Sequence, residues 1–194
     1  MAPFRESIRR IAERLETCEE WLELIRDLDK PIRIRKPPLE FSMRWADKQD
    51  LFTINALEGF VKETNFMEHA LDKGDRCLLL ESDQRIYAFA WVTFRDYWLA
   101  FWYTLKLRPG WSYLVYIFVH PEWGNQGVGA YLLGSLMKAL RNQGCSRLIS
   151  GMYSTWEVSF RLHTKMGFRV QRRLSQCKIL KLFPVPPREE YEAP

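Results

Sequence analysis

The sequence predicts a mixed α/β domain, and three features of the chain support that class. Strand-like and helix-like runs alternate along most of its length. An uncharged β-prone run at residues 111–119 is followed by a glycine-rich loop at 124–129 and a helix-prone run at 131–142. A helix that begins directly after such a loop offers unpaired amides and the positive end of its dipole. This order of elements is typical of a seat for phosphate or pyrophosphate.

Composition bounds the remaining alternatives. The 194 residues are 47% hydrophobic and 27% charged, which suits one well-buried core. No apolar run approaches the roughly 18 residues of a membrane helix, and the charged first ten residues lack the apolar core of a signal peptide. We therefore expect a soluble cytoplasmic protein with no membrane segment. The net charge of +5 favours anionic ligands, but the basic residues are scattered apart from small clusters at 33–36 and 169–173, so nucleic acid is not an expected partner.

The metal-ligating residue types are sparse. The chain has three histidines and four cysteines, with no CxxC pair. We expect the cysteines to be free thiols and predict no metal site. The cysteines are Cys18, Cys77, Cys145 and Cys177.

The first 30 residues predict a separate amphipathic helix, followed by a linker. Apolar residues recur at alternating spacings of four and three, as in a heptad seam, and Pro31 ends the run. The helix would span 4–29, and the proline- and charge-rich residues 31–39 would be the linker. Docking on the chain's own domain and a homodimer contact through 4–28 are both open. The seam residues are Phe4, Ile8, Ile11, Leu15, Cys18, Leu22 and Ile25.

The main domain is expected at 40–183, with a disordered tail at 184–194. Asp47 is a suitable N-cap for its first helix, and residues 82–84 form the tight turn of a hairpin. The expected strands are 41–45, 76–81, 85–94, 111–119, 147–153, 168–173 and 176–183, and the expected helices are 47–61, 66–71, 131–142 and 155–165.

This order of elements, together with HPEWGNQGVGAYLL and a later helix ending in KMGF, resembles the GCN5-related N-acetyltransferases, the GNAT superfamily. The resemblance covers about residues 40–183 and leaves the N-terminal helix as an extra element. It implies an N-acyltransferase that transfers acetyl from acetyl-CoA to a primary amine by direct attack. The acceptor would be a small molecule or a peptide, and no metal would be needed.

The resemblance also implies a binding site for coenzyme A. The family signature Arg/Gln-x-x-Gly-x-Gly/Ala falls on residues 124–129, where Gly127 and Gly129 match and Gly124 replaces the leading Arg or Gln. Asn125 or Gln126 would then substitute for that side chain by hydrogen bonding. The fourth and fifth strands of the family splay apart, and the fourth pairs with the pantetheine arm. The implied ligand residues are Ile117, Phe118, Val119, Gly124, Asn125, Gln126, Gly127, Val128, Gly129 and Ala130.

The resemblance identifies the catalytic residues less directly than the ligand residues. The family often has a tyrosine acid four residues before the Gly-Phe that ends its late helix, and His163 stands there; a packing histidine is the alternative. Tyr113 and Val115 occupy the fourth-strand positions that face the acceptor. Other candidates are Tyr131 and Tyr153 as hydroxyl donors and Glu81, Glu157 or a water chain as base.

The segment 94–118 contains ten aromatic residues beside the expected acceptor site. It would form either a pocket for an apolar acceptor or a longer acyl chain, or ordinary core with an oligomer contact. Because the leading Arg/Gln, the tyrosine acid and a strand base are all replaced, a non-catalytic acyl-CoA-binding or interaction module is the second functional hypothesis.

Overall fold

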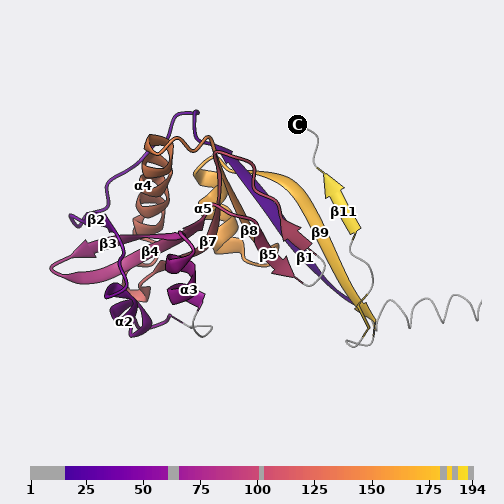
Figure 1. The fold of residues 1–194 in the computed structure, drawn as a ribbon, viewed down its shortest axis with the longest axis horizontal. Coiled ribbons are helices and arrows are strands. Elements are labelled where there is room, and N and C mark those ends of the chain that lie inside the picture. The colour runs from indigo at the N-terminus through magenta and orange to yellow at the C-terminus, as the bar shows by residue number, and fades with distance from the viewer. Residues whose placement is uncertain (1–15, 61–65, 101–102, 180–182, 185–187, 192–194) are drawn as a thin grey trace, which may run out of the picture.

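The computed structural model describes residues 16–60, 66–100, 103–179, 183–184 and 188–191. Within them one large mixed sheet runs in the order β10-β9-β1-β8-β7-β4-β3-β2, with β11 added beside β9 (Figure 1). A separate two-stranded hairpin consists of β5 and β6. The strands are β1 Glu16–Asp27, β2 Ser42–Trp45, β3 Arg76–Ser82, β4 Arg85–Thr93, β5 Tyr97–Ala100, β6 Tyr103–Leu105, β7 Trp111–Val119, β8 Arg147–Tyr153, β9 Arg169–Ile179, β10 Phe183–Pro184 and β11 Arg188–Tyr191, and the helices are α2 Asp50–Asn55, α3 Phe66–Asp72, α4 Val128–Asn142 and α5 Glu157–Lys165.

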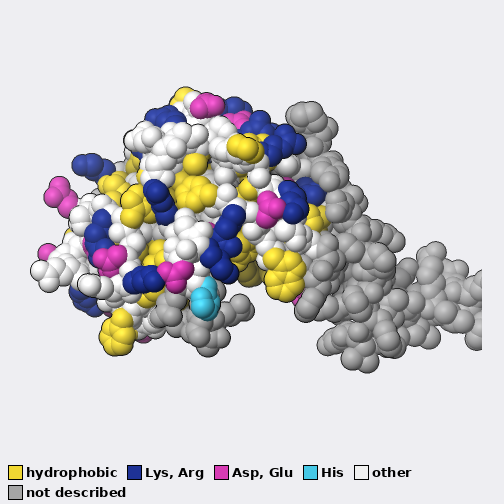
Figure 2. All heavy atoms as spheres, in the orientation of Figure 1, with side chains coloured by type: hydrophobic (Ala, Val, Ile, Leu, Met, Phe, Trp, Pro, Cys, Tyr) yellow, Lys and Arg dark blue, Asp and Glu magenta, His cyan; other side chains and the backbone are white. Residues whose placement is uncertain are grey.

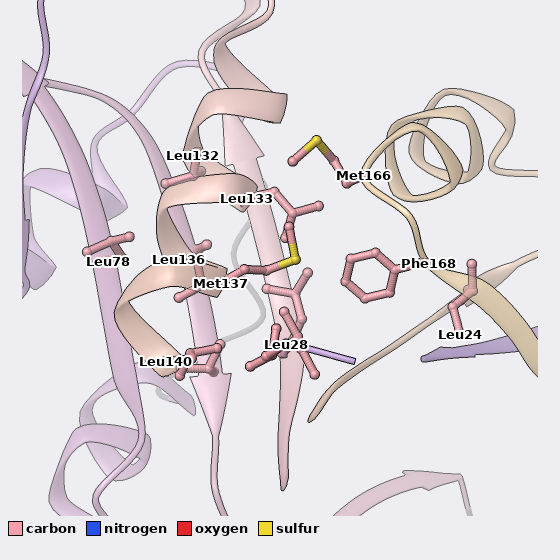
Figure 3. Close-up of a cluster of buried hydrophobic side chains, with 14 of the residues drawn as sticks. Leu24, Leu28, Leu78, Leu132, Leu133, Leu136, Met137, Leu140, Met166 and Phe168 are labelled. Atoms are coloured by element: carbon pink, nitrogen blue, oxygen red, sulfur yellow. The ribbon is translucent and has the colours of Figure 1, made fainter. Parts of the chain in front are cut away.

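Two α-helices cover one face of the sheet. The inward side of α4 presents Leu132, Leu136 and Leu140 to the sheet, as its apolar positions recur every three or four residues. Met166, at the end of α5, and Phe168 extend the same cluster toward β1, where Leu24 and Leu28 complete it (Figure 3). This packing holds the N-terminal end of α4 close to β7.

The opposite face is covered in two parts. Helices α2 and α3 pack on β3 and β4 through Leu51, Ile54 and Met67. The β5–β6 hairpin covers β1, β7 and β8, where Leu105 and the half-buried Tyr103 meet Tyr113, Ile25 and Ile149. The central strands are therefore buried on both faces.

The largest correction concerns the N-terminal segment. Residues 16–27, predicted to be part of a helix, form strand β1, which pairs antiparallel with β8 on one side and β9 on the other. Both faces of β1 are apolar because Leu22 and Leu24 face the helices while Ile25 faces the hairpin. That two-sided burial imitates a helical repeat in the sequence. The remainder of the predicted helix, residues 1–15, lies outside the described residues.

Three smaller corrections follow from tertiary pairing. Helix α2 spans only Asp50–Asn55, although the Asp47 carboxylate does accept the amide of Gln49 (2.7 Å) near its start. The two predicted strands at 168–173 and 176–183 are one long strand, β9, because β1 pairs with it almost throughout. The tail is not uniformly disordered, since its residues 188–191 form β11 on β9.

Candidate active site

Strands β7 and β8 separate at a defined point. Their parallel pairing runs from Trp111 with Arg147 to Leu114 with Ser150 and then stops, although both strands continue. On the other side of β7, Trp91 pairs with Tyr116 and the next residue of β4 pairs with Leu114. Val115 is therefore an extra residue, a β-bulge that bends β7 away from β8. The predicted divergence of these two strands is present and has a local cause.

A cavity of about 770 Å³ fills the gap between the diverging strands. Its walls come from β7, from the end of β8, from α5 and from one residue of β1. Most of the lining is apolar, and among the described residues Glu157 is the only carboxylate that lines it, with a side chain that is 79% exposed. The cavity can therefore hold an apolar chain with few polar groups. Its polar and aromatic lining includes Trp21, Tyr113, Tyr116, Ser150, Trp156 and His163.

The glycine loop lies at one end of this cavity. Gly127 precedes the first residue of α4 with φ = 84°, a left-handed conformation that favours glycine. No side chain caps the helix, so the amides of its first turn are available to a ligand. A Cβ on Gly129 would lie 3.3 Å from Leu162 and 3.5 Å from Val119, both of which line the cavity. The small residue thus lets the start of α4 approach the cavity walls.

Gln126 forms a hydrogen bond within the loop. Its side-chain amide donates to the carbonyl of Glu122 at 2.9 Å, across the turn that contains Gly124. Gly124 itself adopts an ordinary extended conformation, and a Cβ there would lie 3.2 Å from the carbonyl oxygen of Pro121. Asn125 adopts a left-handed φ of 60°. The loop therefore has its own internal support at the position where the family signature has Arg or Gln.

The backbone of β7 faces the gap at alternate residues. The amide of His120 donates to Tyr87 on β4 at 2.8 Å, so Phe118, two residues earlier, also directs its backbone groups to β4. The backbone groups of Ile117 and Val119 point the other way, toward the gap, where no β8 residue pairs with them. Phe118, predicted with these two as a ligand residue, buries its side chain in the cluster under α2 and α3.

His163 lies on α5, buried to 1% exposure, at the cavity wall. Its Nδ1 is 2.8 Å from the carbonyl oxygen of Ser159, which can only accept, so Nδ1 carries the proton. Nε2 is therefore the acceptor in the neutral ring, and it receives the hydroxyl of Ser150 at 3.0 Å. Burial lowers the pKa of His163, an effect that the Ser159 hydrogen bond only partly opposes. The ring is neutral near pH 7, which suits a proton acceptor better than the predicted acid.

Tyr113 also lines the cavity, but its chemistry is limited. It is 2% exposed, its ring packs on Tyr97 at 5.0 Å between centroids, and burial raises the pKa of its hydroxyl well above the usual value. The phenol stays protonated, so it can donate a hydrogen bond but is a poor proton acceptor.

Of the other candidate catalytic residues, some lie at the cavity and others lie elsewhere. Glu157 lines the cavity at its exposed rim. Glu81 instead forms an ion pair with Arg44 at 2.7 Å on the edge of the sheet, and Tyr131 packs against Phe41. Tyr153 contacts Trp156 and Trp21, which both line the cavity.

Two site residues were missed. Trp21 enters the cavity from β1, which was expected to lie outside the domain. A Cβ on Gly151 would lie 2.5 Å from its indole, so the glycine makes room for that ring. Ser150, the partner of His163, had no sequence signal, since a serine within a strand is common. The alternation of Leu22 and Leu24 around Glu23 was the one local sign that this segment is a strand.

Residues 39–168 match the sequence profile described as the acetyltransferase (GNAT) family, more than half of the chain. The chain belongs to the GNAT family. The profile match contains β7, the glycine loop, α4, β8 and α5, so the cavity just described lies almost entirely within it. Strand β1 and residues 28–38 lie outside the match.

Solved structures share the GNAT fold at low sequence identity. A GCN5-related N-acetyltransferase from Sphaerobacter thermophilus matches with a TM-score of 0.64 and 12% identity, over 91% of this chain and 56% of that one. The Escherichia coli ribosomal-protein-S18-alanine N-acetyltransferase matches with a TM-score of 0.54 and 17% identity, over 67% of this chain and 78% of that one. AAC(6')-Iy in complex with the bisubstrate analog CoA-S-monomethyl-acetylneamine matches with a TM-score of 0.53 and 19% identity, over 68% of this chain and 92% of that one.

Several of the matched structures are longer than this chain. The chain spans less than two thirds of the length of several such neighbours, for example 63% of a putative GNAT acetyltransferase from Novosphingobium aromaticivorans, which matches over 83% of this chain with a TM-score of 0.56 and 16% identity. A comparison with curated protein sequences gave no match.

The described residues give few signs of other kinds of site. None of their helices is long and apolar enough to cross a membrane. Over the same residues no group of three or more His, Cys, Asp or Glu side chains could hold a metal ion. On the face shown in Figure 2, Lys and Arg side chains are interspersed with acidic ones rather than gathered in one patch.

Proposed function

We propose that this GNAT protein is an acetyl-CoA-dependent N-acetyltransferase that acts on a primary amine, small molecule or peptide, by direct attack. The observation that carries the proposal is the end of β7–β8 pairing at Leu114 and Ser150, which opens a cavity beside the uncapped N-terminus of α4. One ligand can reach from those amides into the cavity only if it joins an anionic group to a long narrow arm. Coenzyme A has that form.

The described residues fit such a ligand. First-turn amides of α4, from Val128 to Ala130, would hold the pyrophosphate, with Gly127 supplying the turn. The gap-facing backbone groups of Ile117 and Val119 would pair with the amides of the pantetheine arm, as an added strand does. The acyl group would then lie near the bulge at Val115, beside Ser150 and His163.

Ser150 and His163 form a proton relay in this proposal. As the acceptor nitrogen bonds to the thioester carbonyl carbon, its proton passes to Ser150 Oγ while the Ser150 proton passes to His163 Nε2. The relay returns the proton along the same path to the sulfur when the carbon–sulfur bond breaks, so protons balance over the cycle. The Nδ1 hydrogen bond to Ser159 keeps the ring in the accepting tautomer.

Titration calorimetry with acetyl-CoA, followed by thiol-release assays over a panel of amines, tests the proposal. We expect binding and turnover of at least one amine class. Ser150→Ala and His163→Gln should each lower kcat about 100-fold, with unchanged affinity for acetyl-CoA, and the double variant should be no worse than either. Absence of binding at millimolar acetyl-CoA would refute the proposal.

The same assays separate the second functional hypothesis. A non-catalytic acyl-CoA-binding module is favoured by Gly124, which stands where the family signature has Arg or Gln. Binding of acetyl-CoA without turnover of any amine would support that function instead.

A further inference from the structure

The segment between β1 and β2, which was expected to be a linker, lies over α4 in an extended conformation (the indigo trace above α4 in Figure 1). Residues 31–38 are called the strap below. A second cavity, of about 760 Å³, lies between the strap, the glycine loop and the end of α5. It is lined by Arg33, Ile34, Arg35, Lys36, Pro37, Pro38, Asn125, Gln126, Gly127, Ala130, Lys165 and Met166.

The strap is anchored by its alternate residues. The guanidinium of the buried Arg26 donates to the carbonyl of Pro31 at 2.7 Å and fixes its start. Ile32 packs on the main core, and Ile34 occupies the notch that Gly134 leaves in α4, where a Cβ would lie 2.7 Å from its Cγ1. Because these isoleucines face inward, Arg33 and Arg35 are turned outward at defined positions.

The second cavity is strongly basic. Arg33, Arg35, Lys36 and Lys165 all line it, and none of the described residues that line it is acidic. Over the described part of the chain, none of these four side chains is within ion-pair distance of a carboxylate, whereas Arg44 is paired with Asp50 and Arg95 with Asp75. Four unpaired cations around one hollow favour a ligand group with more than one negative charge.

The two cavities border different residues at the start of α4. Val119 and Leu162 of the first cavity are the neighbours of Gly129, while Gly127 and Ala130 line the second. A coenzyme A molecule whose thiol arm lies in the first cavity and whose pyrophosphate lies at α4 would direct its other end into the second. That end carries a phosphate monoester on the ribose 3′ oxygen, with a charge of about −1.5 to −2 at pH 7.

We propose that the strap residues Arg33, Arg35 and Lys36, with Lys165 of α5, bind the 3′-phosphate of coenzyme A and make this protein select coenzyme A over its 3′-dephospho form. The inference rests on the function proposed above. It assigns the binding of the cofactor's distal end to a segment that precedes the family match.

Calorimetric titration with coenzyme A and with dephospho-coenzyme A tests the strap. We expect the wild-type chain to bind coenzyme A at least about tenfold more tightly, because charge-assisted hydrogen bonds to the monoester are lost in the dephospho form. The triple variant R33A/R35A/K36A should lose that difference through weaker binding of coenzyme A, while its affinity for dephospho-coenzyme A stays within about twofold.

A matched control removes the same charge elsewhere. Lys73, Lys138 and Arg141 are exposed and line neither cavity, so K73A/K138A/R141A should keep the preference for coenzyme A. Equal wild-type affinities for the two ligands would overturn the strap assignment while leaving the acetyltransferase proposal intact. An equal loss of both affinities in R33A/R35A/K36A would also overturn it, because the strap would then act on the pyrophosphate. Failure of the wild-type chain to bind either ligand would instead refute the proposed function itself.

Discussion

Ser150 of β8 and His163 of α5 are joined by a 3.0 Å hydrogen bond at the point where β7 and β8 separate. Ser150 is the last β8 residue paired with β7, so its position is fixed by the sheet, and His163 is fixed by α5 and by the ring of Phe168, 4.9 Å away between centroids. A hydroxyl next to a neutral imidazole on the wall of a cavity is an arrangement suited to accepting a proton. The first prediction follows from the protonation of this histidine.

Stability should fall on mild acidification because of His163. Its pKa is lowered by burial, so at a pH just below the unfolded value of about 6.5 the unfolded chain binds a proton that the folded chain does not. The stability contribution is complete above that pH and is lost as the pH falls toward the lowered folded value. Urea midpoints between pH 5 and 8 should show this slope in the wild-type chain and a smaller slope in His163→Gln. Equal slopes in the two proteins would contradict a buried neutral histidine.

Gly127 should be needed for ligand binding as well as for conformation. Gly127 and Gly144 flank the two ends of α4 with φ of 84° and 87°, and a Cβ on either would meet nothing within 4 Å. Alanine at each position should therefore cost about 1–2 kcal/mol in unfolding free energy, from the left-handed backbone. Only Gly127→Ala should also weaken acetyl-CoA binding, by about tenfold or more, because its Cβ lies at the proposed pyrophosphate seat. Calorimetry on both variants compares their affinities for acetyl-CoA. A similar loss of affinity in Gly144→Ala would show that the loss comes from destabilising α4 rather than from blocking the pyrophosphate site.

Trp21 should influence the acceptor rather than the cofactor. Its indole lines the first cavity from β1 and makes an edge contact with Tyr153 at 5.1 Å between ring centroids. Trp21→Ala should raise the acceptor KM about tenfold, with acetyl-CoA affinity unchanged. Steady-state kinetics on the best amine of the panel measures this, with Trp98→Ala as the control, since that tryptophan is exposed and lines neither cavity. A change in acetyl-CoA affinity alone would argue against this division of the cavity.

Removing one partner of the ion pair between Glu23 and Arg172 should destabilise the fold more than removing both. Glu23 of β1 is 2% exposed, lies 2.6 Å from Arg172 of β9 and accepts the hydroxyl of Tyr103 from the β5–β6 hairpin at 2.9 Å. Arg172→Met removes the cationic partner of this buried carboxylate and should cost about 3–5 kcal/mol. The double variant Glu23→Gln/Arg172→Met should recover most of that loss. Urea unfolding checks both, and a double variant as unstable as Arg172→Met would show that the arginine acts through packing.

Much of the domain could be predicted because its signals are local. The bounds of β7 and β8 agree with the predicted ranges, and the β3–β4 hairpin has the two left-handed residues Asp83 and Gln84 in its turn. These elements follow from β-prone runs, glycines and turn residues that neighbours in sequence determine. The glycine loop before α4 was found for the same reason.

The candidate site could be predicted only in part. Ile117 and Val119, two of the expected ligand residues, line the first cavity, and Gly127 lines the second; all three belong to one continuous stretch of chain. Ser150 and Trp21 were missed because they come from strands whose neighbours are remote in sequence. In the aromatic segment 94–118, Tyr113 and Tyr116 line the cavity while Tyr103 packs in the core under the hairpin.

The sequence by itself determined the local elements, the glycine loop and the class of fold, because propensity and turn chemistry act over a few residues. Tertiary structure alone decided that residues 16–27 form a central strand and that residues 31–38 lie over α4. A strand with apolar residues on both faces shows little alternation beyond Leu22 and Leu24, and its pairing depends on partners more than 100 residues away, such as Tyr153 for Trp21. The same long-range packing brings Arg33 and Arg35 beside the glycine loop, where a scattered basic surface becomes a candidate binding site.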